Sequence, residues 1–169
     1  RNGDQINQYE FRRLAGYNGT YKKSYSLGKI EGSTAIGLQL RYDDIPELAL
    51  YHTKDRLYQL GIFNQGSVQE TNGGLWARQI LRFPSGLQTE LGLRFDYFNN
   101  TYEDSWKDFQ KFHSSSSILS PKIKLSYPVN ERWQLYWYGG KSFHSNDTRI
   151  VALDAGRKVV TPAWGSDLG

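Results

Sequence analysis

The chain has 169 residues, 15% of them aromatic, with a formal net charge of +4 and neither cysteine nor methionine. Its lysines and arginines are scattered singly, which argues against a nucleic-acid partner, and without cysteine it has neither a disulfide framework nor a thiolate metal site. No run of about 18 apolar residues occurs, so a transmembrane helix is excluded.

The first two predicted strands differ in the clarity of their alternation. Residues 9–22 form a blurred pattern with several aromatic side chains on one face, and a turn-rich stretch at 26–33 ends it. Residues 34–43 alternate cleanly between an apolar and a polar face. A period of two with one apolar face is typical of a half-buried strand.

The third predicted strand, residues 68–83, follows a long excursion at 44–65 that contains Pro46. We expect the excursion to be a loop. Gly73 and Gly74 interrupt the strand and predict a bulge or bend.

The fourth predicted strand, residues 87–97, has the most regular alternation of the chain. It follows Phe-Pro-Ser-Gly at 83–86, which is typical of a tight turn. Leucine and aromatic side chains point to one side of this strand, and Gln, Glu, Arg and Asp point to the other.

A second long excursion, residues 99–117, carries Trp106, Phe109 and Phe112 at a helical spacing after two acidic residues. We expect a short amphipathic helix in this loop. Two interpretations stay open: an aromatic ligand-binding loop, or a loop that packs on the rim of its own domain.

The last third of the chain contains two further strands, at 122–127 and 133–138, joined by a very short turn at 128–131. A third excursion, at 143–162, leads into a seventh segment that runs to the end of the chain.

Short turns thus alternate with long connections, and strands of about 10 residues suit a tilted crossing of the hydrocarbon layer. The predicted fold is an all-β, antiparallel up-and-down transmembrane β-barrel, of which about seven strands are present. Aromatic residues near the ends of the apolar faces are typical of an interfacial girdle: Tyr42, Tyr97, Tyr127, Trp133 and Trp137. The alternative is a soluble barrel or sandwich in which these aromatics form the core.

The polar faces of these strands should line the interior of the barrel. The residues assigned to the lumen by their parity are Arg41, Glu90, Arg94, Lys122, Lys124 and Gln134. They are predicted either to pair with carboxylates of a plug or merely to hydrate the interior.

Candidate ligand contacts lie in the predicted loops and at strand ends: Asp43, Asp44, Trp106, Phe109, His144, Asp147 and Arg149. The two adjacent aspartates could hold a cation or a sugar hydroxyl, although a solvated carboxylate pair is the simpler interpretation. The three histidines lie far apart without a second ligand at metal spacing, so we expect no metal, no cofactor and no catalytic group.

Four segments resemble successive parts of the barrel of TonB-dependent outer-membrane receptors. They are Arg-Tyr-Asp-Asp at 41–44, Glu-Leu-Gly-Leu-Arg-Phe-Asp-Tyr-Phe at 90–98, Ser-Pro-Lys-Ile at 120–123, and Gly-Lys-Ser-Phe-His-Ser-Asn-Asp-Thr-Arg at 140–149. Their order and spacing match the family from about residue 12 to the end of the chain.

The resemblance implies a bacterial outer-membrane receptor that takes up a scarce solute, such as an iron chelate, a corrinoid or an oligosaccharide. Such a receptor has a barrel of about 22 strands with a plugged lumen, and its plug engages an energy-transducing periplasmic partner. We expect residues 1–169 to belong to the barrel alone, with no plug, because neither the plug nor an apolar secretory signal is found near Arg1. The alternative is a small stand-alone β-barrel or sandwich with a structural or adhesive role.

Overall fold

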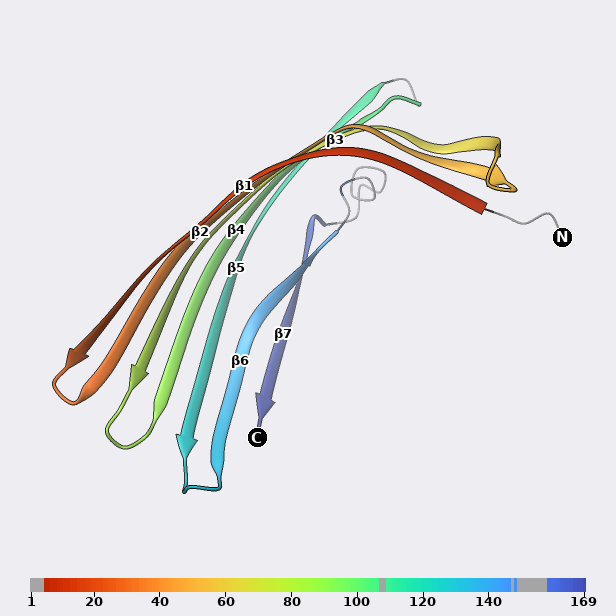
Figure 1. Cartoon of the computed structure of the whole chain (residues 1–169). Helices are drawn as coiled ribbons and strands as arrows, with labels where there is room; N and C mark the ends of the chain where they lie inside the picture. Colours follow the sequence, from red (N-terminus) through yellow and green to blue (C-terminus); the bar gives the residue numbers. More distant parts are fainter. Residues whose placement is uncertain (1–4, 107–108, 147, 149–157) are drawn as a thin grey trace.

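The computed structural model describes residues 5–106, 109–146, 148 and 158–169, and these form one antiparallel sheet with seven strands in chain order (Figure 1). The strands are β1 (Gln5–Leu27), β2 (Ile30–Lys54), β3 (Tyr58–Arg82), β4 (Gln88–Asp104), β5 (Gln110–Pro128), β6 (Gln134–Ser145) and β7 (Val160–Leu168). Each strand pairs with its neighbour in the sequence, and β1 and β7 form the two edges of an open sheet. The predicted up-and-down antiparallel topology is confirmed.

Among the residues described, no helix is long and apolar enough to cross a membrane. These residues also contain a single sheet, so they provide no second layer for the β-sandwich considered as an alternative.

Alternation along the strands gives the sheet two different faces. On β4, Leu91, Leu93 and Phe95 are each close to half exposed, whereas Asp96 is buried on the opposite side. We call the face with the buried residues the inner face and the other the outer face. The exposed apolar residues of the outer face extend over several strands and include Ile36, Leu38, Leu40, Leu75, Leu91, Leu93, Phe95, Leu119 and Leu135.

Two small apolar clusters lie on the inner face. One joins Ile45, Leu48, Val68 and the fully buried Tyr102. The second joins Phe98 and Ile118 to Val159 and Val160, which lie just before and at the start of β7. The core of the described chain is therefore two local clusters rather than one continuous interior.

Very short turns connect the strands at one end of the sheet (Figure 1). Gly28, at φ 61°, turns the chain between β1 and β2, and Gly86, at φ 87°, does so between β3 and β4. Both conformations favour glycine because they are left-handed. Between β5 and β6 the side chain of Asn130 accepts hydrogen bonds from the backbone N–H groups of Arg132 (2.9 Å) and Trp133 (3.0 Å). Tight turns were predicted at the second and third of these places.

At the other end, the predicted loop at 44–65 is wrong. β2 continues to Lys54 and β3 begins at Tyr58, so only three residues connect two strands of 25 residues each. The register between them shifts between Ile45 and Leu48, and twice more before the turn. Pro46 lies within the first shift, where a strand tolerates a residue without an N–H group.

The predicted loop at 99–117 is also largely strand. β4 reaches Asp104 and β5 starts at Gln110, and the four serines at 114–117 pair with β4 in continuous register. The expected amphipathic helix is not present in the described part of this segment: Phe109 has φ 53° in a turn, and Phe112 lies in β5. Hydrogen bonding across the sheet, rather than local periodicity, determines the structure here.

Most of the remaining corrections also lengthen the strands. β1 is longer than the predicted 9–22, the turn expected at 26–33 is confined to two residues, and β4 begins at Gln88. β6 continues to Ser145, which pairs with Val160 of β7. The bulge expected at Gly73 and Gly74 is absent, because β3 pairs with β2 and β4 in unbroken register through both glycines.

Candidate functional site

Charged side chains that lie two residues apart on one strand form the first feature of the inner face. Asp43 has no exposed side-chain surface and accepts two hydrogen bonds from Arg41, at 2.6 and 2.8 Å, and a third of 3.1 Å from Arg12 on β1. Asp44 lies on the outer face, 3.6 Å from Arg13. Both aspartates lie within β2 rather than at its end, and their ion pairs leave Asp43 no free oxygen for a cation or a sugar.

A second arginine and aspartate, on β4, repeat this spacing. Arg94 donates to both carboxylate oxygens of Asp96 at 2.6 to 2.9 Å and reaches Oε1 of Gln39 on β2 at 2.6 Å. The arginine crosses the intervening strand above Gly74, where a methyl group would lie 2.4 Å from its Nη2 atom. The glycine that suggested a bulge therefore provides room for the arginine side chain that hydrogen-bonds from β4 to β2.

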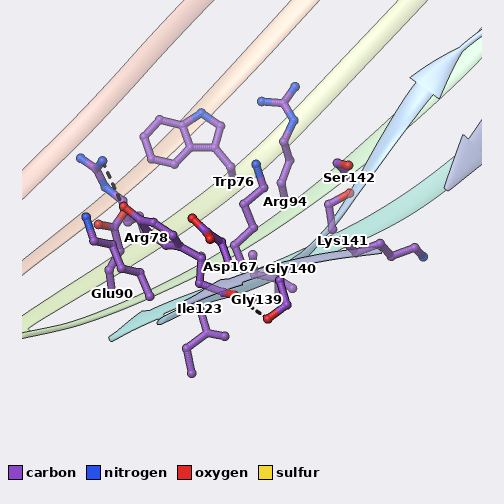
Figure 2. Close-up of a pocket in the computed structure, with 18 of the residues that line it drawn as sticks. Trp76, Arg78, Glu90, Arg94, Ile123, Gly139, Gly140, Lys141, Ser142 and Asp167 are labelled. Carbon is purple, nitrogen blue, oxygen red and sulfur yellow. Dashed lines mark hydrogen bonds and ion pairs between the residues drawn. The ribbon is translucent and has the colours of Figure 1, made fainter. Parts of the chain in front are cut away.

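A hollow of about 790 Å³ lies on the sheet beside this ion pair (Figure 2). Four of the residues assigned to the lumen line it together: Glu90, Arg94, Lys122 and Lys124. Figure 2 shows Trp76 and Arg94 projecting to one side of the sheet while Ile123 points to the other. Arg78 is paired with Glu90 at 3.8 Å, and the Lys124 ammonium lies 4.9 Å from the centre of the Tyr138 ring.

The other two residues assigned to the lumen lie elsewhere. Arg41 lines an adjacent depression that it shares with Arg94. Gln134 is the first residue of β6, paired with Pro128 next to the short turn, and does not line the hollow.

The loop residues predicted to contact a ligand do not lie together in the structure. Trp106 and Phe109 are strongly exposed in the connection between β4 and β5, far from the hollow, which β4 lines between Glu90 and Arg94. His144 pairs with Thr161 across β6 and β7. Asp147 and Arg149 lie outside the described residues.

Sequence reasoning did not identify the contacts that the β6–β7 connection makes with the inner face. Thr148 is buried and donates a hydrogen bond to Glu70 on β3, 78 residues earlier. Val159 packs beside Phe98 of β4. No local motif marks these contacts, which join the β6–β7 connection to strands that are not its neighbours in the sheet.

A second overlooked feature is the packing around Tyr102. Its ring stacks on Phe112 with centroids 6.2 Å apart, and its hydroxyl donates to Asn64. Within the described residues no group of three or more His, Cys, Asp or Glu side chains is arranged to hold a metal ion.

Comparison with known proteins places this geometry in a family. A family model described as "TonB dependent receptor-like, beta-barrel" matches residues 1–152, while no curated protein sequence matches the chain significantly. Among solved structures, the chain is similar to the ferric citrate transporter FecA in its unliganded form, with a TM-score of 0.71 and 13% identity. The similarity covers 82% of this chain and 21% of that one, and at this identity it shows the fold alone. The resemblance inferred from the four sequence segments is confirmed, and the protein belongs to the family of TonB-dependent receptor-like β-barrels.

Proposed function

We propose that this chain is part of the barrel wall of a bacterial outer-membrane receptor that takes up a scarce solute. One observation carries the proposal: in a chain of this family, a single sheet combines an exposed apolar face with a face of paired charges. In water so large an exposed apolar surface is unfavourable. In a bilayer it is the surface that contacts lipid.

The outer face fits a membrane-spanning band. Leu91, Leu93 and Phe95 form its centre on β4, and Tyr97 ends the series. On β5 and β6 the series ends at Tyr127 and Trp133, both exposed and next to the short turns. Aromatic side chains at both ends of an apolar band are typical of outer-membrane barrels.

The inner face then borders the lumen. We assign Arg41, Glu90, Arg94, Lys122, Lys124 and Gln134 to this border, and the long ends of β2 to β5 to the extracellular side, where Trp106 and Phe109 would meet the solute. In strands of 25 residues, more than half of each lies beyond the roughly 9 to 11 residues that a crossing needs.

The mechanism proposed for the whole receptor is conformational rather than catalytic. Solute binds at the extracellular side, and a plug domain then rearranges when an energy-transducing periplasmic partner acts on it. Residues 1–169 belong to the barrel, so the plug and the partner contacts come from other parts of the receptor. The solute classes considered are an iron chelate, a corrinoid and an oligosaccharide.

The test uses the full-length receptor expressed in cells that lack their own copy. We expect it in the outer-membrane fraction as a barrel whose gel mobility changes on heating. We also expect one labelled solute, from a panel of ferric chelates, cobalamin and maltooligosaccharides, to accumulate only while the membrane is energised. Recovery in the soluble fraction, or accumulation that a protonophore leaves unchanged, would refute the proposal.

A further inference from the structure

Within this proposed function, we propose that Lys122 and Lys124 form a binding site for a dianionic solute on the inner wall. The two lysines lie two residues apart on β5, so their side chains leave the same face of the strand at points about 7 Å apart. Both line the hollow beside Arg94. The inference gives the solute a chemical class: a compound with two carboxylate or phosphate groups.

The space above Lys122 is the first argument. In the sheet register it stands between Gly92 of β4 and Gly140 of β6, neither of which has a side chain. A methyl group at Gly92 would meet only Lys122 within ordinary contact distance. A methyl group at Gly140 would lie 3.0 Å from Cγ of Lys122, so this glycine gives the lysine stem room to lie across the wall. The floor of the hollow therefore stays open on the Gly92 side.

The second argument is that the two arginines of the hollow already have carboxylate partners, whereas the two lysines form no ion pair within the described residues. The arginines that line the hollow are bound to carboxylates, Arg94 to Asp96 at 2.6 Å and Arg78 to Glu90 at 3.8 Å. In the described part of the chain neither Lys122 nor Lys124 forms an ion pair with a carboxylate within 4.0 Å. Lys124 rests instead over the ring of Tyr138. Two neighbouring ammonium groups repel each other, and a bound dianion removes this repulsion.

The third argument is the position of the two lysines relative to the apolar band of the outer face. Ile123 separates the two lysines and pairs with Leu91, which belongs to the exposed apolar band of the outer face. The lysines therefore lie at the level of the lipid-facing residues. A cavity with low-dielectric walls focuses the field of such charges on an anion inside it.

The residue type supports a solute rather than a permanent partner. Lysine is flexible and strongly hydrated, whereas arginine forms the rigid bidentate pairs found elsewhere on this wall. A transport path needs sites that bind an ion and also release it. Glu90 stands opposite Lys124 in the register, but its ion pair is with Arg78. Lysines that are not held in an ion pair meet both needs.

The experiment measures binding of inorganic pyrophosphate and succinate to the full-length receptor in lipid vesicles by titration calorimetry, with glucose as a neutral probe. The test variant carries Lys122→Gln and Lys124→Gln together. A second variant, with arginine at both positions, retains the charges. Lys22→Gln, on β1 and outside the hollow, is the matched control.

We expect the double glutamine variant to bind at least one dianion about tenfold more weakly than the wild type, equivalent to about 1.4 kcal/mol. The double arginine variant and the Lys22 control should keep wild-type affinity, and high salt should weaken the wild type. Equal binding by the double glutamine variant would overturn the proposal. So would a wild-type receptor that transports a solute but binds neither dianion.

The remaining alternative is that carboxylates of the receptor itself occupy the site. Reductive methylation followed by mass spectrometry distinguishes the two occupants. We expect Lys122 and Lys124 to react in the absence of added anion and to be protected by it; protection without any anion would overturn the solute proposal alone. Failure of the receptor to reach the outer membrane would instead refute the proposed function and this inference with it.

Discussion

Replacing Leu93 by arginine tests whether the outer face contacts lipid. Leu93 lies in the middle of the apolar series on β4, is 49% exposed, and has Ala77 and Pro121 as its cross-strand neighbours. A surface substitution at such a site in water changes the free energy of unfolding by about 0.5 kcal/mol or less. At the midplane of a bilayer the same change costs about 2 to 4 kcal/mol.

Leu57→Arg is the matched control, because it makes the same chemical change at an even more exposed residue. Leu57 is 83% exposed in the turn between β2 and β3. Along β3, Tyr58 at this turn and Ala77 beside Leu93 are 19 residues apart, a path of about 60 Å at 3.3 Å per residue. Half of the hydrocarbon core is only about 15 Å thick. The control substitution should therefore cost about 0 to 1 kcal/mol.

The measurement is urea-induced unfolding of the full-length receptor in lipid vesicles, compared for the wild type and the two variants. We expect Leu93→Arg to be less stable than Leu57→Arg by at least about 1 kcal/mol. In a soluble protein both leucines would be ordinary exposed positions, and the two variants would behave alike. Equal stabilities would refute the assignment of the outer face to lipid.

Further predictions concern the inner face and use the same unfolding measurement. Asp43→Ala should lower the free energy of unfolding by about 1 to 3 kcal/mol, because it removes the buried acceptor shared by two arginines. Asp44→Ala removes one long ion pair and should lower it by less than about 1 kcal/mol. Similar losses for the two variants would contradict the network described for β2. Gly74→Ala should lower the free energy of unfolding by about 1 to 3 kcal/mol, because the added methyl group displaces the arginine that crosses above it. Gly73→Ala is the control: the nearest atom to its added methyl group is 3.6 Å away, so this alanine should be tolerated. Tyr102→Ala should lower the free energy of unfolding by about 3 to 5 kcal/mol, because it removes a fully buried aromatic side chain. A value near zero would refute the packing of Tyr102 with Ile45, Leu48 and Val68.

The part of the fold that sequence predicted best is the first part of β4, where an unbroken register coincides with a regular apolar face. From Gln88 to Asp104 the strand pairs with both neighbours without a bulge, and up to Tyr97 apolar and polar residues alternate in one phase. Beyond Tyr97 the outer positions are Asn99, Thr101 and Glu103, so residues 99–104 were predicted to be loop although the register continues. On β2 the phase changes between Ile45 and Leu48 and again before Lys54. Periodicity is lost at each shift, which is why a continuing strand was predicted to be a loop.

A different cause hid the start of β5. Ser114 to Ser117 have no apolar alternation, and their extended conformation is fixed by pairing with β4, as for Ser115 and Asn99. Such pairing is a long-range property that a local pattern does not contain. The same holds for Thr148 and Glu70, which lie 78 residues apart.

The sequence predicted several of the residues that line the candidate site, but not which residues bond to one another. Parity assigned Glu90, Arg94, Lys122 and Lys124 to one face, and all four line one hollow. An arginine followed two residues later by aspartate occurs at 41 and 43 and again at 94 and 96, a spacing that indicates an ion pair on one strand face. The third partner of each pair comes from another strand, so only the sheet register could identify it.

Glycine explains why the inner wall is closed at one place and open at another. A methyl group at Gly37 would lie 2.4 Å from the ring of Trp76, and Gly74 underlies the arginine of β4. At these two positions, the missing side chain lets a long side chain of the next strand lie flat and cover the wall. Gly92 and Gly140 flank Lys122, and all three residues line the hollow. Glycine weakens an isolated strand, so its repeated placement on one face is better explained by what the neighbouring side chains and the hollow require than by a need for bends.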